Sequence, residues 1–135
     1  MQQKTNKLIY SLLKIGDQKM KNPVLTFAAL QAIAAANLEG FTISKESLQP
    51  ITAGFSVAVA GTQNSFNAAG LKRVIKYAKE HEEINAFGGW YNTENKRFYF
   101  DAVIICNTLE DAITLGRANN QIAIFNLNTL EEIRL

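Results

Sequence analysis

The sequence predicts an α+β fold with a ferredoxin-like βαββαβ core over about residues 54–126. The first observation behind this prediction is a β-hairpin pattern between Phe87 and Asp101, where two aromatic runs flank the polar turn formed by residues 92–95. The second is the order of patterns over residues 54–126, which reads strand, helix, strand, strand, helix, strand. Right-handed crossovers in such an order place both helices on one face of an antiparallel sheet.

Length and composition indicate one soluble domain over residues 1–135. A formal net charge of +2 is too small to favour a nucleic-acid partner. One cysteine and one histidine cannot build the usual Cys/His zinc site within one chain. The N-terminal segment lacks a signal-peptide pattern, and no apolar run reaches the ~20 residues that span a bilayer. We therefore expect a cytoplasmic protein without a metal, a cofactor or a membrane partner.

Residues 1–38 are expected to form a helical extension packed on the α+β core of residues 40–135. Leu8, Leu12 and Ile15 have helical spacing within a first predicted helix over residues 5–15. A second helix, over about residues 23–37, begins with proline and is apolar around most of its circumference. Such a helix packs on more than one side.

The core begins with a short strand over residues 40–44 and a clearer one over residues 55–60. Gly61 to Ser65 reads as a polar turn in which Asn64 or Ser65 caps the next helix. That helix carries an apolar stripe with helical spacing and lysines and an arginine elsewhere on its surface. The stripe consists of Leu71, Val74, Ile75 and Ala78.

The second hairpin strand continues from Arg97 to Cys106 and is apolar on both faces over its latter half. This pattern predicts a central strand with cover on both sides. The N-terminal helices are the expected cover for the face opposite the core helices, and a partner subunit in a homo-oligomer is the alternative.

Two further elements follow the hairpin. Thr108 to Asp111 resembles a capping box at the start of a short helix, and Gly116 on its apolar stripe permits close approach to the sheet. Residues 121–125 form the last clear strand. Residues 126–135 fit either a strand or a helical turn.

The aromatic and basic hairpin is the first candidate binding surface, because exposed aromatic residues and arginine anchor protein partners or stack on bases. Its candidate partner-binding residues are Trp90, Tyr91, Lys96, Arg97 and Tyr99. In the alternative interpretation, the hairpin packs on its own helices.

A second candidate site assumes that the strands at residues 54–60 and 97–105 run parallel at the centre of the sheet. Two helix N-termini would then meet and hold a nucleotide-like anion, or such a ligand would bind at a subunit interface. The alternative is that the same residues are ordinary helix caps. The candidate ligand-binding residues are Thr62, Gln63, Asn64, Asp101, Arg117 and Gln121.

Asp101 and Cys106 are the remaining residues with chemical potential. Asp101 fits a paired carboxylate near the sheet surface, or a base with a raised pKa if it lies at the floor of a pocket. Cys106 fits a small buried hydrophobic residue, because no histidine lies nearby in sequence to act as its base. The chain shows no nucleophile with a base and no cofactor fingerprint, so we expect no enzymatic activity.

Over roughly residues 40–135 the chain resembles small uncharacterised proteins carried by bacteriophages and other mobile elements. The resemblance implies an accessory protein that inhibits host defence in the host-cell cytoplasm, for instance by occupying a CRISPR nuclease or by sequestering a nucleotide signal. It implies no catalytic residue. The segments that carry it are residues 54–58, 62–66, 88–90, 98–101 and 116–125.

Overall fold

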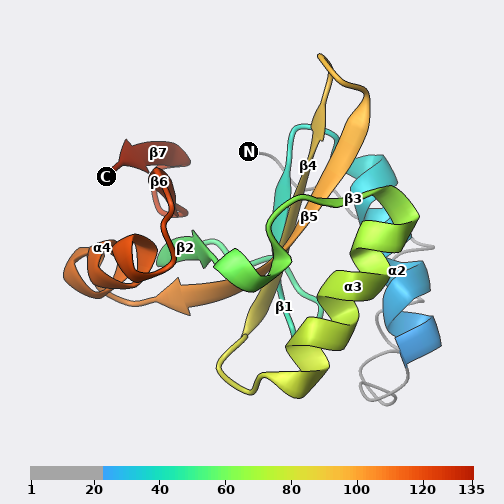
Figure 1. The fold of residues 1–135 in the computed structure, drawn as a ribbon, viewed down its shortest axis with the longest axis horizontal. Coiled ribbons are helices and arrows are strands. Elements are labelled where there is room, and N and C mark those ends of the chain that lie inside the picture. The colour runs from blue at the N-terminus through green and yellow to red at the C-terminus, as the bar shows by residue number, and fades with distance from the viewer. Residues whose placement is uncertain (1–22) are drawn as a thin grey trace.

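The computed structural model describes residues 23–135, which form an α+β fold with a seven-stranded sheet (Figure 1). The first predicted helix, over residues 5–15, lies outside the described residues. The helices are α2 (Pro23–Ala36), η1 (Ala60–Thr62), α3 (Asn67–Glu80) and α4 (Leu109–Ala118). The strands are β1 (Phe41–Ser44), β2 (Phe55–Ala58), β3 (Ser65–Phe66), β4 (Ala86–Asn92), β5 (Arg97–Cys106), β6 (Ala123–Asn126) and β7 (Glu131–Arg134).

The sheet has the order β1-β4-β5-β2-β6-β7, with β3 also paired to β5, and every pairing is antiparallel. The predicted parallel arrangement of residues 54–60 and 97–105 is therefore wrong. The reason lies in the connections. Helix α3 connects β3 to β4, and these two strands pair with opposite sides of β5. This crossover leaves β3 and β4 parallel to each other, and the β4–β5 hairpin then makes β5 antiparallel to both.

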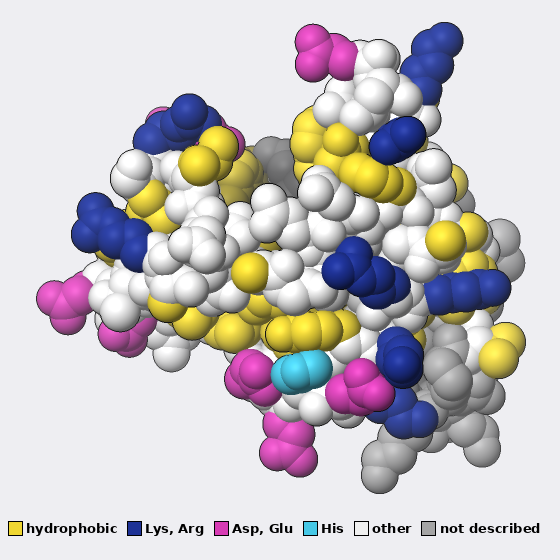
Figure 2. Space-filling view, in the orientation of Figure 1, with side chains coloured by type: hydrophobic (Ala, Val, Ile, Leu, Met, Phe, Trp, Pro, Cys, Tyr) yellow, Lys and Arg dark blue, Asp and Glu magenta, His cyan; other side chains and the backbone are white. Residues whose placement is uncertain are grey.

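Helices α2 and α3 pack on one face of the sheet around the main apolar core. Leu30 and Ile33 of α2 are buried in the same cluster as Leu71 and Val74 of α3 and Phe98 of β5. The predicted stripe of α3 is therefore confirmed as the face that it turns inward. Lysine and arginine side chains lie over the outer surface of α3, as Figure 2 shows.

Helix α4 packs on the same side of the sheet as α3. Ala112 of α4 belongs to a second apolar cluster with Val57 of β2 and Ile124 of β6. Val57 pairs with Ile104 of β5, which packs against the main core, so the two clusters lie on the same face of the sheet. The N-terminal cover expected for the opposite face is not supplied by α2. An apolar circumference shows that a helix is buried but not on which face of a sheet, and α2 lies beside α3.

Several local predictions are confirmed and one is wrong. Thr108 caps α4 by accepting a hydrogen bond from the amide of Asp111, and Gly116 lies where a Cβ would approach Ile124 and Leu135 closely. Residues 131–134 of the tail form β7. Asn64 and Ser65 do not cap α3, which begins after Phe66 with no side-chain cap, because the chain first pairs with β5 as strand β3.

Candidate functional site

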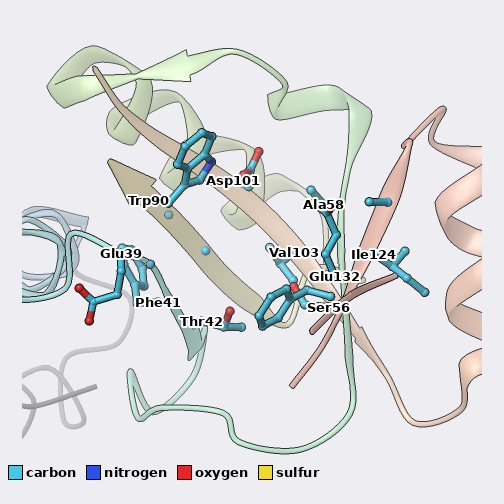
Figure 3. A pocket seen from close by; sticks show the side chains of 15 residues that line it. Glu39, Phe41, Thr42, Ser56, Ala58, Trp90, Asp101, Val103, Ile124 and Glu132 are labelled. Carbon is cyan, nitrogen blue, oxygen red and sulfur yellow. The ribbon is translucent and has the colours of Figure 1, made fainter. Parts of the chain in front are cut away.

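A groove of about 420 Å³ crosses the face of the sheet opposite the helices (Figure 3). Its residues come from both ends of the sheet, from the segment before β1 to strand β7. The lining residues include Glu39, Thr42, Ser56, Ala58, Gly88, Trp90, Asp101, Val103, Phe125 and Glu132. The lining holds three carboxylates and no lysine, arginine or histidine among the described residues.

Asp101 lies on the central strand β5 and faces the groove. Its cross-strand partner is Gly88, which in turn pairs with Thr42 of β1. Gly88 contributes no side chain beside the Asp101 carboxylate, and Cγ2 of Val103 lies 3.2 Å from the place that a Cβ of Gly88 would take. That carboxylate makes no hydrogen bond or ion pair within residues 23–135, and burial raises its pKa from 3.8 to about 6.

A row of aromatic side chains borders the groove on the hairpin side. The rings of Trp90 and Tyr99 stack with centroids 5.1 Å apart, and Phe66 meets Tyr99 edge-on at 4.7 Å. The guanidinium of Arg97 lies 4.7 Å from the centre of the Phe66 ring. We call Trp90, Tyr99 and Phe66 the aromatic row. Its outer member, Trp90, is 44% exposed.

The five residues predicted to bind a partner do not share one face. Trp90, Arg97 and Tyr99 lie on the groove side, because their cross-strand pairing puts them on one face of the hairpin. Tyr91 pairs with Phe98 and packs half-buried against the core on the helix side. Lys96 is exposed in the turn with a φ of 58°.

The predicted anion site at two helix starts does not form. The antiparallel pairing places Cys106 opposite Phe55, at the end of β2 farther from η1 and α3. Burial raises the pKa of the Cys106 thiol, and the Asp111 carboxylate raises it further. Cys106 packs with the second apolar cluster, as expected of a small hydrophobic residue.

The candidate ligand residues have separate structural environments. Thr62 is buried, and its hydroxyl oxygen accepts a hydrogen bond of 3.0 Å from the amide of Ala102. Gln63, Asn64 and Arg117 are exposed. The Gln121 side chain donates to a carbonyl of its own turn, that of Asn119. Asn119 accepts from the amide of Ala60, so α4 ends beside η1, but Asp101 faces the groove on the other side of the sheet.

Sequence reasoning missed most of the groove. Thr42, Ser56 and Phe125 have ordinary roles in strands, and their sequence positions give no sign that they meet. The pairing of Gly88 with Asp101 could be predicted from the sequence, because a hairpin turn fixes the register of its two strands. Counting back from that turn places a residue without a side chain opposite the only carboxylate of β5.

Residues 23–135 contain no group of three or more His, Cys, Asp or Glu side chains placed to hold a metal ion. None of their helices has the length and apolar character needed to cross a membrane. Comparison of the chain with protein-family models, with curated proteins and with solved structures gives no match.

Proposed function

We propose that this chain is a non-enzymatic binding protein that meets a protein partner with the groove side of its sheet. The observation that carries the proposal is the pairing of Trp90 with Tyr99. Trp90 is 44% exposed, yet its ring is held by stacking on Tyr99 at the rim of an open groove. A large aromatic side chain that is fixed before binding loses little conformational freedom in a complex, which suits it as an anchor.

A protein partner is favoured over a nucleic acid by the charge of this surface. Glu39, Asp101 and Glu132 lie in the groove that the aromatic row borders, and they would repel a phosphate backbone. Arg97 is held over Phe66 at the far end of the row. In keeping with the resemblance to mobile-element accessory proteins, we place the partner among host-defence proteins, such as a CRISPR nuclease.

The proposal is tested by measuring the affinity of a partner captured from host lysate and then purified. Replacing Trp90 or Tyr99 with alanine should weaken binding at least tenfold, as expected for an interface hot spot worth about 2 kcal/mol. Ile122→Ala is the matched control, because Ile122 is an exposed apolar residue outside the hairpin. Unchanged affinity in folded Trp90→Ala and Tyr99→Ala variants would refute the proposal.

A small-ligand module is the second candidate, and the volume of the groove favours it. About 420 Å³ falls within the ~300–1,000 Å³ typical of ligand pockets. The carboxylates of the lining favour a neutral or cationic ligand over the nucleotide-like anion expected from helix N-termini. In a panel of nucleotides and amines, the amines should then raise the melting temperature of the protein in proportion to saturation.

Asp101 also meets one requirement of an acid or base catalyst, since its pKa is raised to about 6 in a groove. Within residues 23–135, however, no side chain forms a hydrogen bond with it, so no second group is positioned for a proton relay or a covalent step. The arrangement therefore supports binding better than catalysis.

We further propose that residues 54–126 belong to the ferredoxin-like class. This is supported by the neighbouring strands β4, β5, β2 and β6, which are antiparallel throughout, and by the position of α3 and α4 on one face. In this arrangement the groove lies on the face that the class leaves open.

A further inference from the structure

We infer that the groove receives an arginine side chain of the protein partner, with its guanidinium between the Asp101 carboxylate and the Trp90 ring. The inference rests on the proposed function, because the aromatic row would contact the same partner. It adds the chemistry of the group that the groove recognises.

Charge complementarity is the first argument. Glu39, Asp101 and Glu132 are among the lining residues of the groove, and no lysine, arginine or histidine of the described residues lines it. Glu132 has an exposed partner in Arg134, at 3.5 Å. Asp101 has none within the described residues, and burial raises its pKa to about 6 because no neighbouring cation offsets the loss of hydration. A bound cation would supply that missing charge.

The space beside Asp101 is the second argument. The cross-strand position holds Gly88, so the nearest neighbour on β4 contributes no side chain above the sheet. Ala58 and Val103 extend the floor with small apolar surfaces. Such a floor suits the methylene stem of a long basic side chain, which packs on apolar surface while its charged end reaches a carboxylate.

The position of Trp90 distinguishes arginine from lysine. Trp90 pairs with Tyr99, two residues before Asp101, so it is a diagonal neighbour of Asp101 across the two strands. Figure 3 shows the two side chains next to each other on the groove side of the sheet. A guanidinium is planar, so it can stack on an aromatic face and donate two hydrogen bonds to a carboxylate, whereas an ammonium cannot do both as well.

Strand register puts two arginines of the described residues on this face, and neither is engaged with Asp101. Arg134 pairs with Glu132 at 3.5 Å. Arg97 follows the same alternation as Tyr99 and Asp101, but its guanidinium lies 4.7 Å from the Phe66 ring, at the end of the aromatic row. It does not pair with Asp101. The site beside Asp101 is therefore left for a group from another molecule.

The test uses N-acetyl-arginine methylamide as the probe and the corresponding citrulline amide as a neutral control of nearly the same shape. Binding is followed by NMR through the Asp101 carboxyl carbon and the Trp90 indole N–H. The arginine probe should shift both signals and bind about tenfold more tightly than the citrulline probe, as expected for a charge-assisted pair. Asp101→Asn should remove that preference, while Asp111→Asn, a carboxylate outside the groove, should keep it.

Equal binding of the two probes, binding that survives Asp101→Asn, or no shift of either signal up to 50 mM (about the weakest binding of interest for one side chain) would overturn the inference. A lysine probe that binds as tightly as the arginine probe would overturn the choice of arginine. The purified partner separates this inference from the proposed function. If Trp90→Ala abolishes partner binding while Asp101→Asn leaves it unchanged, the aromatic anchor stands and the arginine site fails.

Discussion

Gly88 is the cross-strand partner of Asp101, so the only carboxylate of β5 faces a position without a side chain. This relationship places a polar site in the middle of β5, directly before the apolar run of residues 102–105. It also explains why Asp101 keeps no protein partner among the described residues, since the neighbouring strand offers it neither a hydrogen-bond donor nor a charge.

The raised pKa of Asp101 predicts a specific pH dependence of stability. Its pKa is about 6 in the folded chain against an ordinary value of 3.8, so between these values the folded state binds more protons and stability falls as pH rises. The full penalty, reached above pH 6, is at most about 3 kcal/mol. Asp101→Asn should remove it, so the variant should be more stable at pH 7.5 and close to the parent at pH 4.

Urea unfolding of both proteins across this pH range measures the difference directly, because all other titrating groups are shared. Two parallel stability profiles would show that Asp101 is hydrated or paired in solution. That result would also weaken the argument that the groove lacks a cation of its own.

Thr62 is predicted to stabilise the fold rather than to bind a ligand. Its hydroxyl accepts from the amide of Ala102 where η1 interrupts the pairing of β5 with β2 and β3. Thr62→Val would leave that buried amide without a partner and should lower the free energy of unfolding by about 1–3 kcal/mol. Gln63→Ala, at the exposed neighbouring position, should change it by less than about 0.5 kcal/mol in the same chemical denaturation experiment. Equal effects would contradict this assignment.

The local elements were predictable because their patterns are short-range. The stripe of α3 and the alternation of β5 follow from helical and strand periodicity, and the structure confirms both. The orientation of β2 against β5 was predicted wrongly, although the antiparallel sheet of the predicted class already requires these two strands to run in opposite directions. The side on which α2 packs was missed as well, since an all-round apolar helix fits either face of a sheet.

The candidate site was predictable only in part. Trp90, Tyr99 and Asp101 could be identified from the sequence as unusual residues of one hairpin, and strand alternation puts all three on one face. Glu39 and Glu132 come from opposite ends of the sheet, so their place in the same groove lining as Asp101 depends on the complete strand order. Local sequence patterns do not contain that information.

Gly70 should be irreplaceable despite its place in helix α3. A Cβ there would lie 2.2 Å from the carbonyl carbon of Ser65, a backbone atom that cannot move aside. Gly70→Ala should therefore lower stability by about 2 kcal/mol or more, although alanine favours a helix by about 1 kcal/mol. Ala69→Gly, at the exposed neighbouring position, is the control and should lower the free energy of unfolding only by the difference in helix propensity, about 1 kcal/mol. A higher melting temperature for Gly70→Ala would contradict the close packing of α3 on β3.

Cys106 should react slowly with thiol reagents at neutral pH. Burial and then the Asp111 carboxylate raise its pKa, and the thiolate is the reactive form. Asp111→Asn should speed alkylation, because it removes the carboxylate that helps to raise the pKa of Cys106. The hydrogen bond from the amide of residue 111 to the Thr108 hydroxyl remains in the variant. Glu110→Gln removes a neighbouring charge and serves as the control. An unchanged rate in Asp111→Asn would show that burial alone sets the reactivity of this thiol.

The two faces of the hairpin should differ sharply in their effect on stability. Phe98 is 9% exposed and stacks on Phe100 at 4.8 Å within the main core, so Phe98→Ala should cost about 3–5 kcal/mol. Trp90 is 44% exposed on the opposite face, so Trp90→Ala should cost about 1 kcal/mol, mainly the stacking on Tyr99. Denaturant midpoints of the two variants give the comparison. If Trp90→Ala destabilised the chain as much as Phe98→Ala, the aromatic row would be part of the folding core, and its role as a partner anchor would lose its support.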